Sequence, residues 1–124
     1  MGLARRFLLD TNAIIYLVNG SLSSPLPCGR HGVSVITEIE LLSYAGMSGA
    51  EEQKIVELLR LLDRIQLTDA VRDEAIRLRR RSRLRLPDAI IAASALVTGA
   101  VLLTNDQAFS VIDGLIVESL QLST

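Results

Sequence analysis

The chain has 124 residues, of which 49% are hydrophobic, and its thirteen basic and fourteen acidic residues give a formal net charge of −1. This length predicts a single domain spanning residues 1–124, and the hydrophobic content excludes an intrinsically disordered chain. The near-neutral charge excludes a protein that binds nucleic acid through its total charge alone. The lone cysteine, Cys28, excludes an internal disulfide and agrees with a reducing compartment.

In chain order, short apolar segments alternate with helical patterns. Strands are predicted at residues 7–9, 33–36, 65–67, 101–103 and, at a sheet edge, 115–117. Helices are predicted at 13–18, 37–45, 48–63, 70–82 and 86–97, and the proline- and glycine-containing segment 20–32 is predicted to be a loop. This alternation favours an α/β fold, a three-layer α/β/α sandwich around a mostly parallel central sheet.

A long apolar segment without a charge, Ala89 to Asn105, does not have the pattern of a membrane span. Ser94, Thr98 and Gly99 interrupt it, which indicates a buried helix followed by a buried strand. The arginine pair near the N-terminus is followed by only three apolar residues before Asp10, too few for a secretory signal. We therefore expect a cytoplasmic protein without a membrane association.

Four acidic residues follow predicted strands or stand near the starts of predicted helices: Asp10, Glu40, Asp88 and Asp106. In an open parallel sheet, the carboxyl ends of the strands and the first turns of the helices face a common crevice, so we expect these side chains to meet there. Carboxylates at close range repel one another, and oxygen-only clusters hold hard cations such as Mg²⁺ or Mn²⁺. The pattern therefore predicts a metal site with phosphodiester chemistry.

Each acid also has an ordinary structural explanation. Asp10 and Asp106 are suited to cap short helices, and Asp88 lies in a first turn where the helix dipole favours an acid. Glu40 completes a capping-box pattern with Thr37. The occurrence of all four acids at such positions favours the metal site over four separate caps.

Four segments, Leu8–Asn12, Ser34–Leu41, Leu86–Ala93 and Leu103–Phe109, resemble the PIN-domain ribonucleases and, more narrowly, a VapC-type toxin of a toxin–antitoxin pair. The resemblance covers nearly the whole chain in order. It implies a PIN-like fold and a Mg²⁺- or Mn²⁺-dependent endoribonuclease that cleaves RNA. It also implies a homodimer and inhibition by a small antitoxin protein.

By this resemblance, the catalytic and metal-ligating residues are Asp10, Glu40, Asp88 and Asp106, supported by Asn12 and Thr104. The second acid has a competitor, Glu38, but on a helix it points about 200° away from Glu40, so both cannot face the crevice. The Thr-x-x-Glu pattern of the family selects Glu40. The amide of Asn12 and the hydroxyl of Thr104 are able to orient a carboxylate or a metal-bound water. Asn105 is assigned no role.

Such a site explains catalysis without histidine, because a bound metal lowers the pKa of a water molecule and makes it a nucleophile at neutral pH. The one histidine, His31, is expected at the surface. In-line attack by water leaves a 5′-phosphate and a 3′-hydroxyl. With no tryptophan and few other aromatic residues, substrate recognition is expected to depend on backbone charge and RNA shape.

Seven of the thirteen basic residues lie between Arg72 and Arg85. On a helical wheel Val71, Ala75 and Leu78 form the buried face, while Arg72, Arg79 and Arg83 line one flank and are the candidate RNA contacts; Arg77, Arg80 and Arg81 lie mainly opposite the core. A solvated helix face and a site for an acidic antitoxin segment remain alternatives. A second feature, the wide apolar face of residues 48–63, is expected to contribute to a dimer or antitoxin interface as well as to the core.

Other classes of protein fit the same residues less well. A receiver-like or phosphatase-like domain needs a second aspartate near Asp10, where Asn12 stands, and a late lysine, whereas the only lysine is Lys54. A P-loop nucleotide binder needs a glycine-rich loop ending in Lys-Ser or Lys-Thr, and the chain has none. The remaining alternative is a non-catalytic PIN-like domain that binds RNA or protein.

Overall fold

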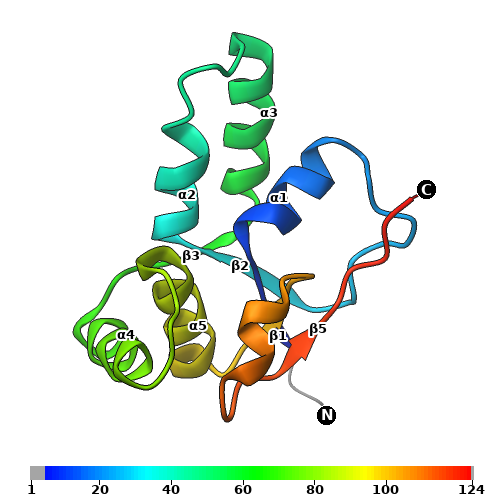
Figure 1. Ribbon diagram of the computed structural model, residues 1–124. Helices are drawn as coiled ribbons and strands as arrows, with labels where there is room; N and C mark the ends of the chain where they lie inside the picture. The colour runs from blue at the N-terminus through cyan, green and yellow to red at the C-terminus, as the bar shows by residue number, and fades with distance from the viewer. Residues whose placement is uncertain (1–4, 124) are drawn as a thin grey trace.

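A parallel sheet forms the centre of the molecule in the computed structural model, which describes residues 5–123 (Figure 1). Its strands in the described residues are β1 (Arg6–Leu9), β2 (Arg30–Ser34), β3 (Asp63–Ile65), β4 (Val101–Leu103) and β5 (Val117–Glu118). They lie in the order β3-β2-β1-β4-β5, and every pairing is parallel. The predicted fold class is therefore confirmed.

Helices cover both faces of this sheet. They are α1 (Thr11–Val18), α2 (Val35–Leu42), α3 (Gly49–Arg60), α4 (Asp69–Arg81), α5 (Leu86–Thr98) and a short 3-10 helix, η1 (Gln107–Val111). Side chains alternate between the faces along a strand, so Leu8 of β1 packs with α4, α5 and η1, while Phe7 and Leu9 pack with α1, α2 and α3. The result is the expected three-layer sandwich with two apolar clusters.

Helix α5 is the most deeply buried helix. Every residue from Ala89 to Ala95 is buried, and Ser94 satisfies its hydroxyl by donating to the Ile90 carbonyl at 2.7 Å. The small side chains allow the helix to lie close to the sheet, and Gly99, in the left-handed conformation with φ of 70°, ends it. Within residues 5–123, no helix is long and apolar enough to cross a membrane.

The boundary between β2 and α2 differs from the prediction. The strand ends at Ser34 and the helix begins at Val35, because the Ser34 hydroxyl accepts a hydrogen bond from the Ile36 amide at 3.2 Å and caps the helix. Thr37, which was predicted to open the helix, is instead buried inside it. The β-branched pair Val35 and Ile36 suggested a strand, but the cap and the tertiary packing override that propensity.

Other boundaries move by a few residues. β2 begins at Arg30, inside the predicted loop, β3 begins at Asp63, and β5 lies at Val117–Glu118. The short helix η1 follows β4 and is capped by Asp106. The predicted buried face of α4 is confirmed, because Val71, Ala75 and Leu78 are the buried residues of that helix.

Most of the apolar face of α3 packs into the hydrophobic core. Ile55 and Leu59 are buried, and Leu58 and Leu62 pack against the same cluster. Leu61 at the end of the helix is strongly exposed. Most of the face that was expected to reach an interface therefore packs inside the molecule.

Candidate functional site

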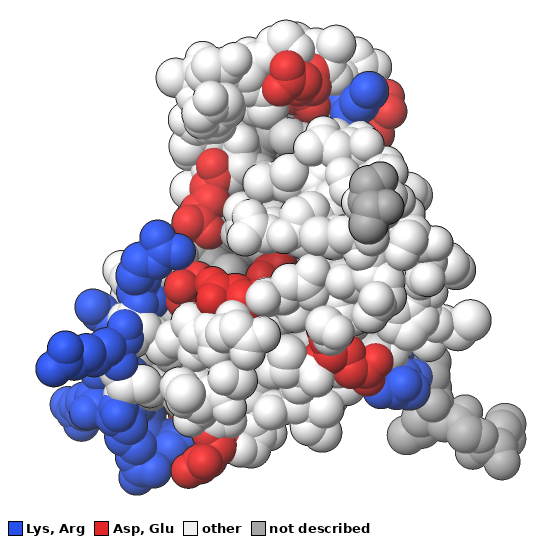
Figure 2. Space-filling model, turned by 45° about the vertical axis from the view of Figure 1, so that its right-hand side comes forward, with Lys and Arg blue, Asp and Glu red and all other residues white. Residues whose placement is uncertain are grey.

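A cavity of about 220 Å³ lies at the carboxyl ends of the central strands. It is lined by Asp10, Thr11, Asn12, Glu40, Arg85, Asp88, Ile91, Asp106 and Phe109. Figure 2 shows acidic side chains gathered in a hollow of the surface, beside a broad basic patch. The fold thus brings all four predicted acids and Asn12 to one place, although their positions span nearly the whole chain.

Asp10 is the most buried of these acids, with 5% of its surface exposed. It follows β1 and caps α1, where its Oδ1 accepts a hydrogen bond from the Ala13 amide at 2.8 Å. Its Oδ2 accepts a hydrogen bond from the hydroxyl of Thr104, which follows β4. Both carboxylate oxygens are therefore held in place by groups from two separate segments.

The pKa of Asp10 is raised above its ordinary value, mainly because burial disfavours the charged carboxylate. The hydrogen bonds from Thr104 and Ala13 oppose this rise, while the nearby charges of Asp106 and Asp88 add to it. A divalent cation beside Asp10 would reverse this balance, because an adjacent positive charge favours the ionised carboxylate.

Glu40 and Glu38 lie in different surroundings. The Glu40 carboxylate accepts a hydrogen bond from the Thr11 hydroxyl at 3.0 Å and lines the acid cavity. Glu38 pairs with Arg64 of β3 and is not part of the cavity lining. The helical separation expected from the sequence is present, and it leaves Glu40 as the acid of α2 at the cavity.

Asp88 and Asp106 complete the acidic lining. Asp88 lies in the first turn of α5, with its Oδ2 3.5 Å from the Arg85 Nε. Asp106 caps η1 by accepting a hydrogen bond from the Ala108 amide at 2.9 Å, and its own amide donates to the Thr104 hydroxyl at 3.0 Å. The capping explanation is thus satisfied for Asp106 at the same time as its side chain lines the cavity.

The donor chemistry of the cavity fits a hard cation, because its lining offers carboxylate, amide and hydroxyl oxygens and no thiol or imidazole. Within residues 5–123, however, no group of three or more His, Cys, Asp or Glu side chains is arranged to hold a metal ion as it stands. Mutual repulsion disfavours close approach of uncompensated carboxylates. A hard cation such as Mg²⁺ is commonly held by one or two carboxylates and completes its coordination with water.

The two supporting residues differ in how firmly the structure holds them. Thr104 is buried and links Asp10 to the Asp106 amide, whereas Asn12 is exposed and lines the cavity. Asn105 instead fixes the C-terminal segment, donating to the Leu120 carbonyl at 3.0 Å and accepting from the Leu120 amide at 2.7 Å. Asn105 therefore has a structural task at the C-terminal segment.

Two polar residues of the site, Thr11 and Arg85, were not predicted to belong to it. Thr11 donates to Glu40 and lies 3.3 Å from the hydroxyl of Thr37, and Arg85 lines the cavity beside Asp88. The available signals were the position of Thr11 directly after Asp10 and that of Arg85 three residues before Asp88. Both signals are only short sequence spacings, and only the folded chain shows which side chains Thr11 and Arg85 contact.

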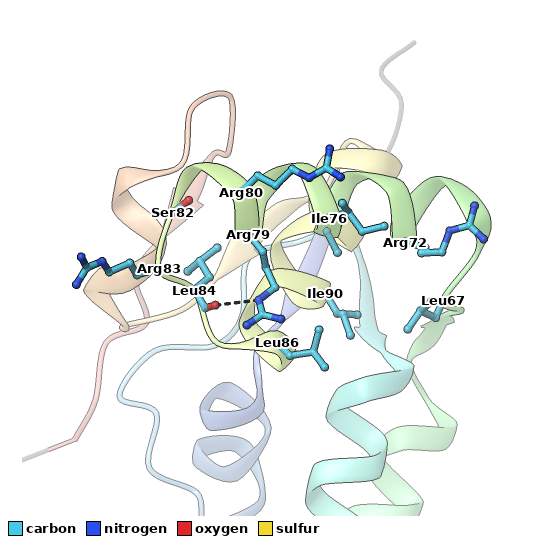
Figure 3. A pocket seen from close by; sticks show the side chains of 11 residues that line it. Leu67, Arg72, Ile76, Arg79, Arg80, Ser82, Arg83, Leu84, Leu86 and Ile90 are labelled. Atoms are coloured by element: carbon cyan, nitrogen blue, oxygen red, sulfur yellow. Dashed lines mark hydrogen bonds between the residues drawn. The ribbon is translucent and has the colours of Figure 1, made fainter.

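The candidate RNA contacts Arg72, Arg79 and Arg83 do not line the acid cavity. They line a separate groove of about 860 Å³ between α4 and the start of α5, together with Arg80 (Figure 3). The Arg79 Nε donates to the Leu84 carbonyl at 3.4 Å, and Arg72 pairs with Asp69 and Asp73. Arg80, which was predicted to lie mainly opposite the core, is exposed and also borders this groove.

Several solved structures with a similar fold come from toxin–antitoxin systems. A toxin–antitoxin complex from Klebsiella pneumoniae is 28% identical and has a TM-score of 0.72. The match covers 88% of this chain and 94% of that chain. VapBC-1 from nontypeable Haemophilus influenzae is 27% identical, with a TM-score of 0.73 and coverages of 92% and 97%. VapBC2 from Rickettsia felis, bound to a DNA fragment from their promoter, is 24% identical, with a TM-score of 0.77 and coverages of 94% and 99%.

A search of curated proteins finds no match for this sequence. The family model described as PIN domain matches residues 7–115, which include all four cavity acids and every strand except β5 and the first residue of β1. On the extent of this match, the chain belongs to the PIN domain family.

Proposed function

We propose that the protein is a Mg²⁺- or Mn²⁺-dependent endoribonuclease and the toxin of a VapC-type toxin–antitoxin pair. The observation that carries this proposal is the convergence of Asp10, Glu40, Asp88 and Asp106 on one cavity at the carboxyl edge of the sheet. Membership of the PIN domain family and the likeness to solved toxin–antitoxin proteins support it.

In this proposal the four carboxylates would hold one or two cations, which would supply Lewis acidity and activate water as the nucleophile. Thr104 and the Ala13 amide keep the Asp10 carboxylate oriented, and Thr11 does the same for Glu40. The Asn12 amide, exposed at the cavity, is placed to orient water or a phosphate oxygen. Hydrolysis breaks the bond between phosphorus and the 3′ oxygen, leaving a 5′-phosphate and a 3′-hydroxyl.

The proposed protein partners are a small antitoxin and a second copy of the chain. The antitoxin is supported by the toxin–antitoxin complexes among the structural neighbours. The second copy is proposed to pack on the groove of α4 and α5, where Leu67, Ile76 and Leu86 expose 47%, 44% and 52% of their surface. Apolar side chains clustered in this way are costly to leave in water.

The second candidate is a PIN-like domain that binds RNA or protein without cleaving it. One observation favours this alternative, because no three acids within residues 5–123 are already arranged to hold a cation. The retention of four acids in one cavity favours the nuclease, since a purely binding domain has no need to hold mutually repelling carboxylates.

Cleavage of RNA by the purified protein separates the two candidates. Total RNA is incubated with Mn²⁺ or Mg²⁺, with chelator, and with the Asp10→Asn variant in parallel. Discrete fragments that require both the metal and Asp10, and that carry 5′-phosphates, support the nuclease. If well-folded protein leaves all RNA intact with either metal but still binds it, the non-catalytic domain is the better description.

A further inference from the structure

Arg85 is unusual among the residues at the acid cavity because, within residues 5–123, it is the only lysine or arginine of the lining. Its Nε lies 3.5 Å from the Asp88 Oδ2, and its side chain is 82% exposed. An ion pair with this degree of exposure contributes little to stability, because water screens it and the long side chain loses entropy. The Asp88 contact alone therefore gives little reason for an arginine at this position.

The local backbone gives no reason either. Arg85 occupies the N-cap of α5, where Ser, Thr, Asp and Asn are preferred, and its side chain makes no capping hydrogen bond. A cation at the N-terminus of a helix also opposes the helix dipole. Arg85 thus departs from two local rules at once, and such departures occur most often at functional sites.

The backbone of Arg85 is fixed, whereas its guanidinium is not. The Arg85 carbonyl accepts a hydrogen bond from the Ala89 amide at 2.9 Å, so its backbone belongs to the rigid start of α5, which is buried from Ala89 to Ala95. The guanidinium is exposed and linked to the protein only through Asp88 among the described residues. It is therefore anchored at the rim of the cavity but free to turn toward a ligand.

We infer that Arg85 binds a phosphate of the RNA beside the scissile bond, and that it pairs with Asp88 only in the free protein. This inference rests on the proposed nuclease function. With a cation held at Asp88, the guanidinium would no longer pair with that carboxylate, and its two parallel donors would be free to match phosphate oxygens. Arg85 then contributes to holding the substrate over the carboxylates, while the carboxylates hold the cation.

The alternative to a specific phosphate contact of Arg85 is general attraction of RNA by the neighbouring arginines. Arg79, Arg80 and Arg83 line the α4 groove close in sequence to Arg85, and the basic patch adjoins the acidic hollow (Figures 2 and 3). If this patch attracts RNA only through its total charge, replacing any one of its arginines would lower RNA affinity slightly. Arg81 is a matched control, because it is exposed, lies in the same basic run and lines neither the groove nor the acid cavity.

The test compares wild type, Arg85→Gln, Arg85→Lys and Arg81→Gln in two measurements. The first is the affinity for a fluorescently labelled single-stranded RNA in Mn²⁺, by anisotropy across a salt series, with KM and kcat where cleavage occurs. The second is Mn²⁺ affinity without RNA, by calorimetry. We expect Arg85→Gln to weaken RNA binding about tenfold and to lower the salt slope by about one. We expect Arg85→Lys to retain part of the affinity, and Mn²⁺ affinity not to fall.

Two results overturn the inference. If Arg85→Gln and Arg81→Gln bind RNA equally well, Arg85 makes no specific phosphate contact. If Arg85→Gln loses Mn²⁺ affinity, Arg85 acts by placing Asp88 instead of binding RNA. Absence of cleavage by wild type contradicts the nuclease proposal alone, because the anisotropy comparison still decides the role of Arg85. Absence of any RNA binding by wild type contradicts both.

Discussion

The Thr104 hydroxyl donates a hydrogen bond to the Asp10 carboxylate across a sequence separation of 94 residues, and both groups are buried. The same hydroxyl accepts a hydrogen bond from the Asp106 amide at 3.0 Å. One side chain after β4 therefore fixes the acid that follows β1 and the turn that carries a second acid. Because β1 and β4 are adjacent in the sheet, this link depends on strand order and on no local pattern.

Replacing Thr104 by valine should lower the free energy of unfolding by about 1–3 kcal/mol, because the Asp10 Oδ2 and the Asp106 amide lose a partner in a buried region. Thr104→Ser keeps the hydroxyl and serves as the control. Chemical denaturation of both variants measures the effect. Equal stability of Thr104→Val and wild type would show that the hydroxyl is not needed to hold this turn.

Glu40→Gln should reduce RNA cleavage far more than Glu38→Gln. Glu40 faces the acid cavity and accepts from Thr11, whereas Glu38 is paired with Arg64 outside it. Loss of one charge-stabilising group in an active site commonly costs about 10²–10³ in kcat. Initial rates on a defined RNA oligonucleotide compare the two matched variants. The reverse order of effects would place Glu38 at the site and Glu40 outside it.

Mn²⁺ should raise the melting temperature of wild type, and Asp88→Asn should remove most of that increase. A ligand that binds only the folded state at 100 times its Kd contributes about 2.7 kcal/mol. Asp113→Asn, an exposed acid outside the cavity, controls for a general change in charge. Differential scanning fluorimetry with Mn²⁺ and with chelator makes the comparison. Equal Mn²⁺ stabilisation of Asp88→Asn and wild type would exclude Asp88 as a ligand.

The raised pKa of Asp10 predicts how the stability of the metal-free protein depends on pH. The folded state binds this proton more tightly than the unfolded state, so ionised Asp10 destabilises the fold. The penalty is absent below the ordinary value of 3.8, grows as pH rises through the folded pKa, and is complete above it. Relative to wild type, Asp10→Asn should therefore gain stability as pH rises from below 3.8 to neutral.

Urea denaturation of both proteins in chelator, repeated across this pH range, measures the trend. Asparagine keeps the ability to cap α1, so the cap itself should contribute little to the difference. Asp113→Asn again controls for the change in net charge. A stability difference between Asp10→Asn and wild type that is constant with pH, or that moves the opposite way, would contradict the raised pKa.

Ile76→Asp should convert the proposed homodimer into a monomer, because it places a charge in the exposed apolar groove of α4 and α5. Val111→Asp is the matched control, since Val111 is a 70% exposed apolar residue outside that groove. Size-exclusion chromatography with light scattering gives the mass of each variant. A wild-type monomer, or a dimer that persists in Ile76→Asp, would exclude this groove as the dimer interface.

Much of the architecture was predictable because its signals are local. Alternating apolar segments and helical periodicity predict the order of strands and helices, and Val71, Ala75 and Leu78 were correctly identified as the buried face of α4. The placement of acids after strands and at helix starts also predicts the cavity, because the carboxyl ends of parallel strands share one edge of the sheet. The roles of those acids in metal binding and cleavage remain predictions.

The boundary between β2 and α2 at Ser34 could not be predicted from local sequence patterns. Val35 and Ile36 have strand propensity, and only the cap at Ser34 together with the packing of α2 makes them helical. The start of β3 at Asp63 depends likewise on its pairing with β2, where Gly32 faces Asp63. Helix and strand propensities contribute only small free energies, and at the ends of elements the free energy of tertiary contacts exceeds them.

The sequence by itself determined the fold class and the set of acids that meet, because burial periodicity and position relative to strands are properties of short segments. The tertiary structure alone decided which groups hold those acids, as shown by the hydrogen bonds from Thr104 to Asp10 and from Thr11 to Glu40. Both contacts join segments far apart in sequence. Distances between side chains are set by packing, and packing exists only once the sheet and its helices are assembled.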